Sequence, residues 1–173
     1  MEEAYRIAIE EFFKISLADL EFSILYLGKY STILRTLGRV ILIDPSDVIN
    51  VHLLEEYNKV DYVFYSCRLS DSYNREVALE IYRTFKPIFF VDPTTYTDLF
   101  LDIPGEYLVN MHPGFYNIAD LKINAMLGLY EVPVIAYLIK MAGMNILYTS
   151  RSEHLIFEKE KVDAMILPLA DDT

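Results

Sequence analysis

One cysteine, few basic residues and no long apolar run limit what this chain can be. The single Cys67 excludes an intrachain disulfide framework and fits a reducing compartment. No apolar run approaches the roughly 18 residues that a membrane helix needs. The N-terminus begins with acids and has no basic region, so we expect no secretory signal. These absences predict a cytoplasmic protein that does not span a membrane.

Positive charge is scarce, because 15 Lys and Arg stand against 26 Asp and Glu, which gives a net charge of -11. Such a charge repels phosphate backbones and anionic lipid, so nucleic acid and membrane surfaces are not expected partners. Apolar residues are abundant: 53% of the 173 residues are hydrophobic, and 24% are charged. This composition predicts one domain, 1–173, with a substantial core.

The first half of the chain alternates between strand and helix patterns. Residues 1–16 predict an amphipathic helix. After it we expect strands at 22–27, 31–36, 39–44, 60–66 and 88–91. One helix should begin after a Ser46 cap, and another should run from about Ser72 to Phe85. This order favours an α/β fold with a partly parallel sheet.

The second half is rich in β-prone runs separated by Gly- and Pro-containing turns. Strands are expected at 106–111, 121–127, 134–140, 145–149 and 164–167, and one or two helical turns at 153–161. No linker or internal repeat interrupts the pattern.

Several short motifs occur in a recognisable order. They are Leu27-Gly28-Lys29, Ile41-Leu42-Ile43-Asp44-Pro45, Asp61-Tyr62-Val63, Ser66-Cys67-Arg68-Leu69-Ser70-Asp71-Ser72, Tyr148-Thr149-Ser150-Arg151, Val162-Asp163 and Leu167-Pro168. Together they resemble the metallo-β-lactamase-fold superfamily, near the branch of metal-dependent hydrolases that includes ascorbate-6-phosphate lactonase. The resemblance covers residues 22–169. It implies an αββα sandwich with mixed sheets, extended by the N-terminal helix and shortened at the C-terminus.

The resemblance also implies a metal-binding corner, written Thr-His-x-His-x-Asp-His in the family. Here Cys67, Leu69 and Ser72 replace the histidines, and only Asp71 remains. Arg151 stands where the family has a metal-bridging aspartate, and its fixed positive charge would repel a divalent ion. A metal-bound hydroxide needs a filled set of ligands. We therefore expect no metal and no cofactor, with zinc or another divalent metal as the alternative.

The catalytic candidates are Cys67, Asp71 and Arg151, and each has competing interpretations. Cys67 is either a small buried apolar residue or a reactive thiolate whose pKa Arg68 and Arg151 would lower. Asp71 either caps the following helix or pairs with Arg151, with or without Asp44. Such a salt bridge would place an organic cation in the metal position.

A binding site for a small anion is a further expectation at this place. Lys29, Arg68 and Arg151 could form a local positive pocket for a phosphate, with Asp44 and Ser72 beside them. The alternative is that the three cations make ordinary ion pairs.

These observations predict a non-catalytic protein, a pseudoenzyme acting in binding or assembly. The alternative is a metal-dependent or metal-free hydrolase of a small substrate, phosphorylated or not, at Cys67 and Asp71. A third hypothesis makes the chain one subunit beside a sibling that keeps the histidines. We expect the helix at residues 1–16 to cover a sheet face in its own subunit or in a partner of a homo-oligomer.

Overall fold

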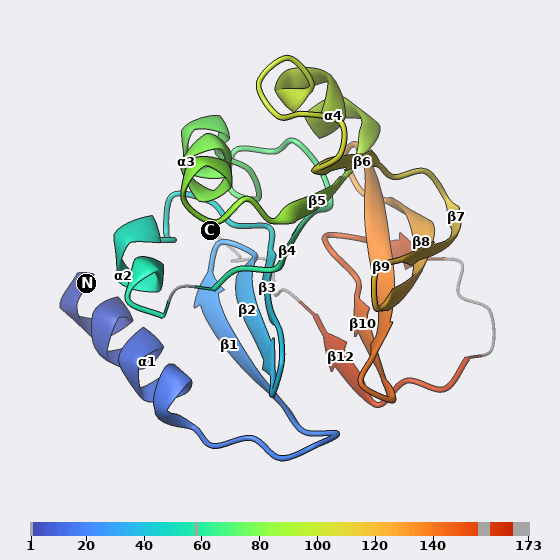
Figure 1. Ribbon diagram of the computed structural model, residues 1–173. Coiled ribbons are helices and arrows are strands. Elements are labelled where there is room, and N and C mark those ends of the chain that lie inside the picture. The colour runs from blue at the N-terminus through green and yellow to red at the C-terminus, as the bar shows by residue number, and fades with distance from the viewer. Residues whose placement is uncertain (1, 58, 156–159, 168–173) are drawn as a thin grey trace. The chain divides into compact units, whose positions relative to one another are not determined.

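The computed structural model describes residues 2–57, 59–155 and 160–167. The chain divides into two compact units, residues 1–109 and 110–173 (Figure 1). Within these described ranges, four helices and two mixed sheets confirm the α/β class that the sequence predicts. The assignment of 1–173 to one domain stays a prediction, and residues 168–169 at the end of the predicted core lie outside the described residues. No helix in the described ranges is long and apolar enough to cross a membrane.

The first unit is built on a sheet with the strand order β1-β2-β3-β4-β5-β6. β1, β2 and β3 are antiparallel neighbours, whereas β3, β4 and β5 run parallel. The carboxyl ends of β3, β4 and β5 therefore lie at the same edge of the sheet. The strands are β1 (Phe22–Gly28), β2 (Ser31–Thr36), β3 (Val40–Ile43), β4 (Tyr62–Tyr65), β5 (Ile88–Val91) and β6 (Leu108–Asn110).

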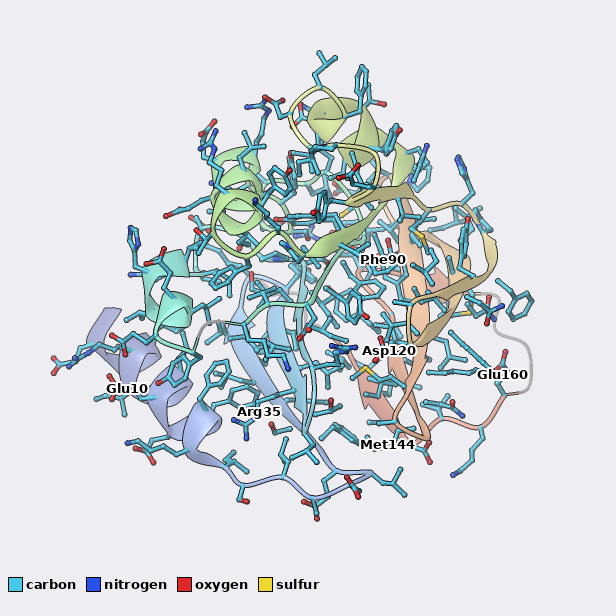
Figure 2. The ribbon with its side chains drawn as sticks, in the orientation of Figure 1. Glu10, Arg35, Phe90, Asp120, Met144 and Glu160 are labelled. Atoms are coloured by element: carbon cyan, nitrogen blue, oxygen red, sulfur yellow. The ribbon has the colours of Figure 1, made fainter. Side chains whose placement is uncertain are left out.

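The central strands are buried on both faces, as their continuous apolar sequences predict. On one face their side chains join a cluster with residues from α1, α2 and α3, and Figure 1 shows these three helices on the same side of the sheet. On the other face Phe64 stacks on Phe90, labelled in Figure 2, with 4.7 Å between ring centroids. The helices of this unit are α1 (Glu2–Lys14), α2 (Val51–Glu55), α3 (Arg75–Phe85) and α4 (Pro93–Leu99).

The N-terminal helix α1 covers the sheet of its own chain. Ile9 and Phe12 are 1% and 5% exposed and lie in the same cluster as the strand side chains. The ring of Phe13 stacks on Tyr57 at 4.0 Å between centroids. The expected amphipathic helix is thus present, and its apolar stripe is buried without a second subunit.

The second unit has the strand order β11-β8-β9-β10-β12, with β7 paired to β8. All neighbours are antiparallel except β10 and β12, which are parallel. Met126, Ala136, Leu138 and Leu147 form a buried cluster on this sheet. The strands are β7 (Gly114–Ile118), β8 (Leu121–Leu129), β9 (Pro133–Met141), β10 (Met144–Tyr148), β11 (His154–Leu155) and β12 (Ala164–Ile166).

Two predicted helix starts were wrong. Asn50, and not Ser46, caps α2 by accepting a hydrogen bond from the His52 amide, because the hydroxyl and amide of Ser46 bond to Ser31 instead. Asn74, and not Asp71, caps α3. The reason is a separate turn before α3, in which the amides of Ser72 and Tyr73 both donate to the Leu69 carbonyl.

The sequence patterns missed α4 and β7, and they misassigned part of 153–161. The described part of that segment forms β11, paired with Leu129 and Gly128 of β8, while residues 156–159 lie outside the described residues. Gly128 permits this approach, since a Cβ there would lie 1.8 Å from the Ser152 hydroxyl. A side chain at Gly128 would therefore force the Ser152 side chain to shift.

Candidate functional site

Polar residues follow the carboxyl ends of three neighbouring parallel strands in the first unit. Asp44 follows β3, Ser66 follows β4, and Asp92 follows β5. All three are buried. In α/β sheets, ligands bind outside the carboxyl ends of parallel strands. This edge, with residues 66–72 leading away from it, is the candidate functional site and is called the strand-end corner below.

Asp44 is the central charged group of the strand-end corner. Its side chain is fully buried, and its backbone has φ 46°, a left-handed conformation that Asp and Asn tolerate better than most residues. Oδ1 accepts a hydrogen bond from the Ser66 amide at 2.7 Å, and Oδ2 accepts one from the Ser66 hydroxyl at 2.6 Å. Both carboxylate oxygens thus receive short, charge-assisted bonds from the end of β4.

The turn after β3 is fixed by further hydrogen bonds. The Ser31 hydroxyl donates to the Asp44 carbonyl at 2.8 Å and accepts from the Ser46 amide at 3.0 Å. The Tyr65 hydroxyl donates to the Pro45 carbonyl at 2.9 Å. These bonds join β2, β3 and β4 at the corner, so the position of the Asp44 carboxylate is set by three strands.

Cys67 lies beside this carboxylate, 1% exposed, as a free thiol. Burial, followed by the charge of Asp44, raises its pKa to about 11. At neutral pH the side chain is therefore a thiol and a weak nucleophile. This favours the interpretation of Cys67 as a buried apolar residue over a reactive thiolate.

Arg68 turns away from Cys67 toward α4. Its guanidinium lies 2.8 Å from Oδ1 of Asp98, whose other oxygen accepts a hydrogen bond from the Tyr73 hydroxyl at 2.6 Å. Arg75 reaches the same carboxylate at 3.7 Å and Asp102 at 2.6 Å. Burial and the bond to Asp98 raise the pKa of Tyr73. This network connects residues 68–75 to α4.

The other predicted site residues are dispersed among different partners. Lys29 pairs with Asp47 at 3.0 Å, so Lys29 and Arg68 each have a carboxylate partner. Ser72 is fully buried, and Asp71 lies in the turn before α3. Arg151 belongs to the second unit, where its guanidinium lies over the Tyr130 ring at 5.6 Å. The pairing of Asp71 with Arg151 stays a prediction, as does an anion site that includes both.

The side chains described at the strand-end corner do not make a fitting set of metal ligands. In residues 2–57, 59–155 and 160–167 no group of three His, Cys, Asp or Glu side chains is placed to hold a metal ion. A zinc or similar centre needs such a convergent set. Here the thiol is protonated at neutral pH and both Asp44 oxygens accept bonds from Ser66.

Sequence reasoning missed the contributions of Ser66, Asp92 and Asp98. Asp92 caps α4 by accepting hydrogen bonds from the amides of Thr94 and Thr95. The pair Asp92-Pro93 was a usable signal, because Asp at the cap followed by Pro in the first turn is typical of a helix start. Ser66 and Asp98 gave no local signal, since Asp44, which accepts from Ser66, and residues 68–75, which contact Asp98, lie at least 22 residues away along the chain.

Comparisons with known proteins agree with this architecture. A family model described as "Beta-lactamase superfamily domain" matches residues 23–172. Igni18, a metallo hydrolase from Ignicoccus hospitalis, superposes with a TM-score of 0.60 at 19% identity, over 72% of this chain and 58% of that one. The metallo-beta-lactamase fold protein YhfI from Bacillus subtilis superposes with a TM-score of 0.56 at 13% identity, over 75% of this chain and 61% of that one.

A diiron beta-hydroxylase, CmlA from Streptomyces venezuelae, superposes with a TM-score of 0.58 at 14% identity, over 76% of this chain and 30% of that one. The chain thus spans no more than about three-fifths of the length of these structures. At such identities the likeness shows the fold alone. No curated protein sequence matches the chain.

Proposed function

From the premise that this chain belongs to the metallo-β-lactamase superfamily, we propose that it is a non-catalytic member that acts in binding or assembly. The hydrogen-bonded strand-end corner takes the place of the family's metal centre. The structures that resemble the chain are mostly hydrolases or diiron enzymes, so the proposal assigns it a role different from theirs.

The observation that carries this proposal is the bonding of Asp44. Each of its carboxylate oxygens accepts a bond from Ser66, at 2.7 and 2.6 Å, and the buried Cys67 beside it has its pKa raised to about 11. A hydrolytic centre needs an activated water or a nucleophile with an accessible reactive form. Among the described side chains at this corner, Asp44 and Ser66 bond to each other, and neither an activated water nor a reactive nucleophile is supported by their arrangement.

Membership of the superfamily supports the alternative function. This alternative is a hydrolase that acts at Cys67 and Asp71 on a small substrate, phosphorylated or not. The purified chain should be assayed with added zinc, manganese or iron against a chromogenic phosphate diester and a chromogenic carboxylic ester. We expect no metal-dependent turnover above the buffer rate. Turnover that requires a metal, and that Asp71→Asn or Cys67→Ser abolishes while Arg83→Gln does not, would establish the hydrolase instead.

Assembly is the second part of the proposal. The chain would associate with a second copy or with a sibling subunit that carries the histidines missing here. Light scattering after size-exclusion chromatography measures the first, and co-purification from native cells measures the second. A monomer that co-purifies with no other chain would leave only the binding of a small ligand.

A further inference from the structure

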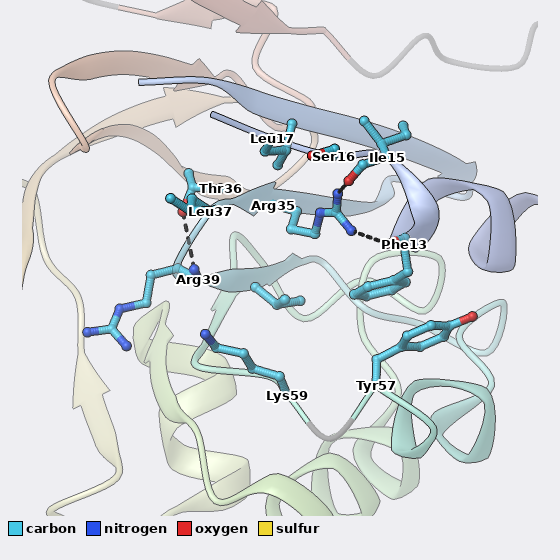
Figure 3. A pocket seen from close by; sticks show the side chains of 11 residues that line it. Phe13, Ile15, Ser16, Leu17, Arg35, Thr36, Leu37, Arg39, Tyr57 and Lys59 are labelled. Atoms are coloured by element: carbon cyan, nitrogen blue, oxygen red, sulfur yellow. Dashed lines mark hydrogen bonds between the residues drawn. The ribbon is translucent and has the colours of Figure 1, made fainter. Parts of the chain in front are cut away.

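A hollow lies in the first unit, at the opposite end of β3 from Asp44. It has a volume of about 360 Å³. Its walls come from the segment after α1, the turn between β2 and β3, and the segment after α2 (Figure 3). β3 runs from Val40, which lines this hollow, to Ile43 beside the strand-end corner. The two places are therefore separate.

The charge of the hollow is opposite to that of the protein. Three cationic side chains, Arg35, Arg39 and Lys59, line it, and none of the described residues that line it is a carboxylate. The whole chain has a net charge of -11. A concave site of one sign with apolar walls concentrates ions of the other sign. The hollow is thus chemically suited to an anion, although the chain as a whole is acidic.

Arg35 is held rigidly and has no carboxylate partner among the described residues. Its Nη1 donates to the Phe13 carbonyl at 2.6 Å and its Nη2 donates to the Ile15 carbonyl, as Figure 3 shows. The rings of Phe12 and Phe13 lie 5.4 and 5.5 Å from the guanidinium carbon. Partial burial lowers the pKa of Arg35. A guanidinium has five N–H donors, so donors remain beyond the two that bond to these carbonyls.

Arg39 and Lys59 share one carboxylate, Asp61. The Arg39 guanidinium lies 3.1 Å and the Lys59 ammonium 3.9 Å from its oxygens, and Asp61 also accepts a bond from the Val40 amide at 2.8 Å. The side chains of Arg39 and Lys59 are 39% and 41% exposed. These contacts hold the two cations in the wall of the hollow, so that they add positive charge to that of Arg35.

The walls define the rest of the ligand. The stacked pair of Phe13 and Tyr57 lines one side, and Ile15 and Leu17 add apolar surface. The volume of about 360 Å³ is that of a site for a small molecule. Clustered Arg and Lys side chains favour a doubly charged phosphate over a single carboxylate. We propose that this hollow binds a small phosphate monoester whose organic part packs against the Phe13–Tyr57 pair.

Isothermal titration calorimetry with phenyl phosphate tests the proposal on the full chain. We expect binding that weakens as sodium chloride is added, since the attraction is electrostatic. Lys59→Gln and Arg39→Gln should each weaken binding by about fivefold or more. Benzyl alcohol, which lacks the charge, should not bind, and inorganic phosphate, which lacks the ring, should bind more weakly.

Two control variants distinguish binding in this hollow from nonspecific attraction to surface charge and from binding at the strand-end corner. Arg83→Gln removes the same charge from the exposed end of α3, and Cys67→Ala alters the strand-end corner. Neither should change the affinity. No binding at millimolar phenyl phosphate, or equal affinity in Lys59→Gln, Arg39→Gln and Arg83→Gln, would overturn the proposal. Because the assay needs no metal and no turnover, its outcome is independent of whether the strand-end corner is catalytic.

Discussion

At the scale of single residues, Asp44 combines three requirements in one side chain. It is fully buried, it adopts φ 46°, and it accepts two bonds from Ser66. Asp is one of the few residue types that meets the last two together, because its short side chain carries acceptor oxygens and tolerates the left-handed region. The Asp-Pro motif after an apolar strand marked this position in the sequence, but not its bonding partner.

Substituting Asp44 should destabilise the first unit strongly. Asp44→Ala would leave the Ser66 amide and hydroxyl buried without their acceptor and would place Ala at a positive φ. We expect it to lower the free energy of unfolding by about 3 kcal/mol. Asp44→Asn, which keeps an acceptor and the backbone preference, should lower it by about 1 kcal/mol. Urea denaturation followed by circular dichroism compares the two, and equal losses would contradict the role given to these bonds.

Cys67 should react slowly although it is a free thiol. Its pKa is raised from 9.0 to about 11 by burial and by Asp44. Two pKa units lower the thiolate fraction near neutral pH about 100-fold, and burial slows access further. Iodoacetamide labelling at pH 7 should therefore be at least about 100-fold slower in the folded chain than in urea. Labelling at similar rates in both states would show an accessible thiolate.

The same shift predicts how stability depends on pH. The folded state holds the Cys67 proton more tightly than the unfolded state, so this contribution is fully present below pH 9 and is lost as pH rises toward about 11. Tyrosines and lysines also titrate in this range. The difference between the wild type and Cys67→Ala isolates the thiol, and that difference should shrink between pH 9 and 11. A constant difference would contradict the shift.

At the scale of elements, helix starts were predicted less accurately than strands. The apolar runs of β3, β4 and β5 are evident in the sequence, because strands buried on both faces have no polar alternation. The start of α3 was not evident, since Asp71, Ser72 and Asn74 are all good capping residues. The hydrogen bonds of the turn at Leu69 decide among them, and those bonds depend on where β4 ends.

The cap of α3 can be tested directly. Oδ1 of Asn74 accepts bonds from the amides of Glu76 and Val77 at 3.0 and 3.2 Å. Asn74→Ala should lower the free energy of unfolding by about 1 kcal/mol, whereas Asn74→Asp should preserve it. If Asp71→Ala lowered the free energy of unfolding and Asn74→Ala did not, Asp71 would be the cap instead.

The N-terminal helix should be integral to the first unit. Phe12 is 5% exposed and lies beside the Arg35 guanidinium. Phe12→Ala should lower the free energy of unfolding by about 3 kcal/mol, because it opens a cavity in the core. Ile7 lies on the same helix at 49% exposure, so Ile7→Ala should change it by less than about 0.5 kcal/mol. Deleting residues 1–16 should cause aggregation, and a soluble, equally stable deletion variant would contradict this role.

At the scale of the whole molecule, the order of weak motifs predicted the superfamily, which the family model over residues 23–172 confirms. The motifs lie within or beside strands, where the fold constrains residue type, so the series carried information that no single motif did. The hollow between α1 and the β2–β3 turn was not predictable. Arg35, Arg39 and Lys59 meet there only because the hairpin and the segment after α2 approach α1 in space.

The most direct test of the central claim is the metal content of the protein. The chain should be expressed with added zinc or manganese, passed over a chelating resin and measured by inductively coupled plasma mass spectrometry. The account predicts less than about a tenth of an ion per chain, because no filled set of ligands converges among the described residues of the strand-end corner. One or two ions per chain, lost on Asp71→Asn or Cys67→Ala but kept on Arg83→Gln, would contradict it.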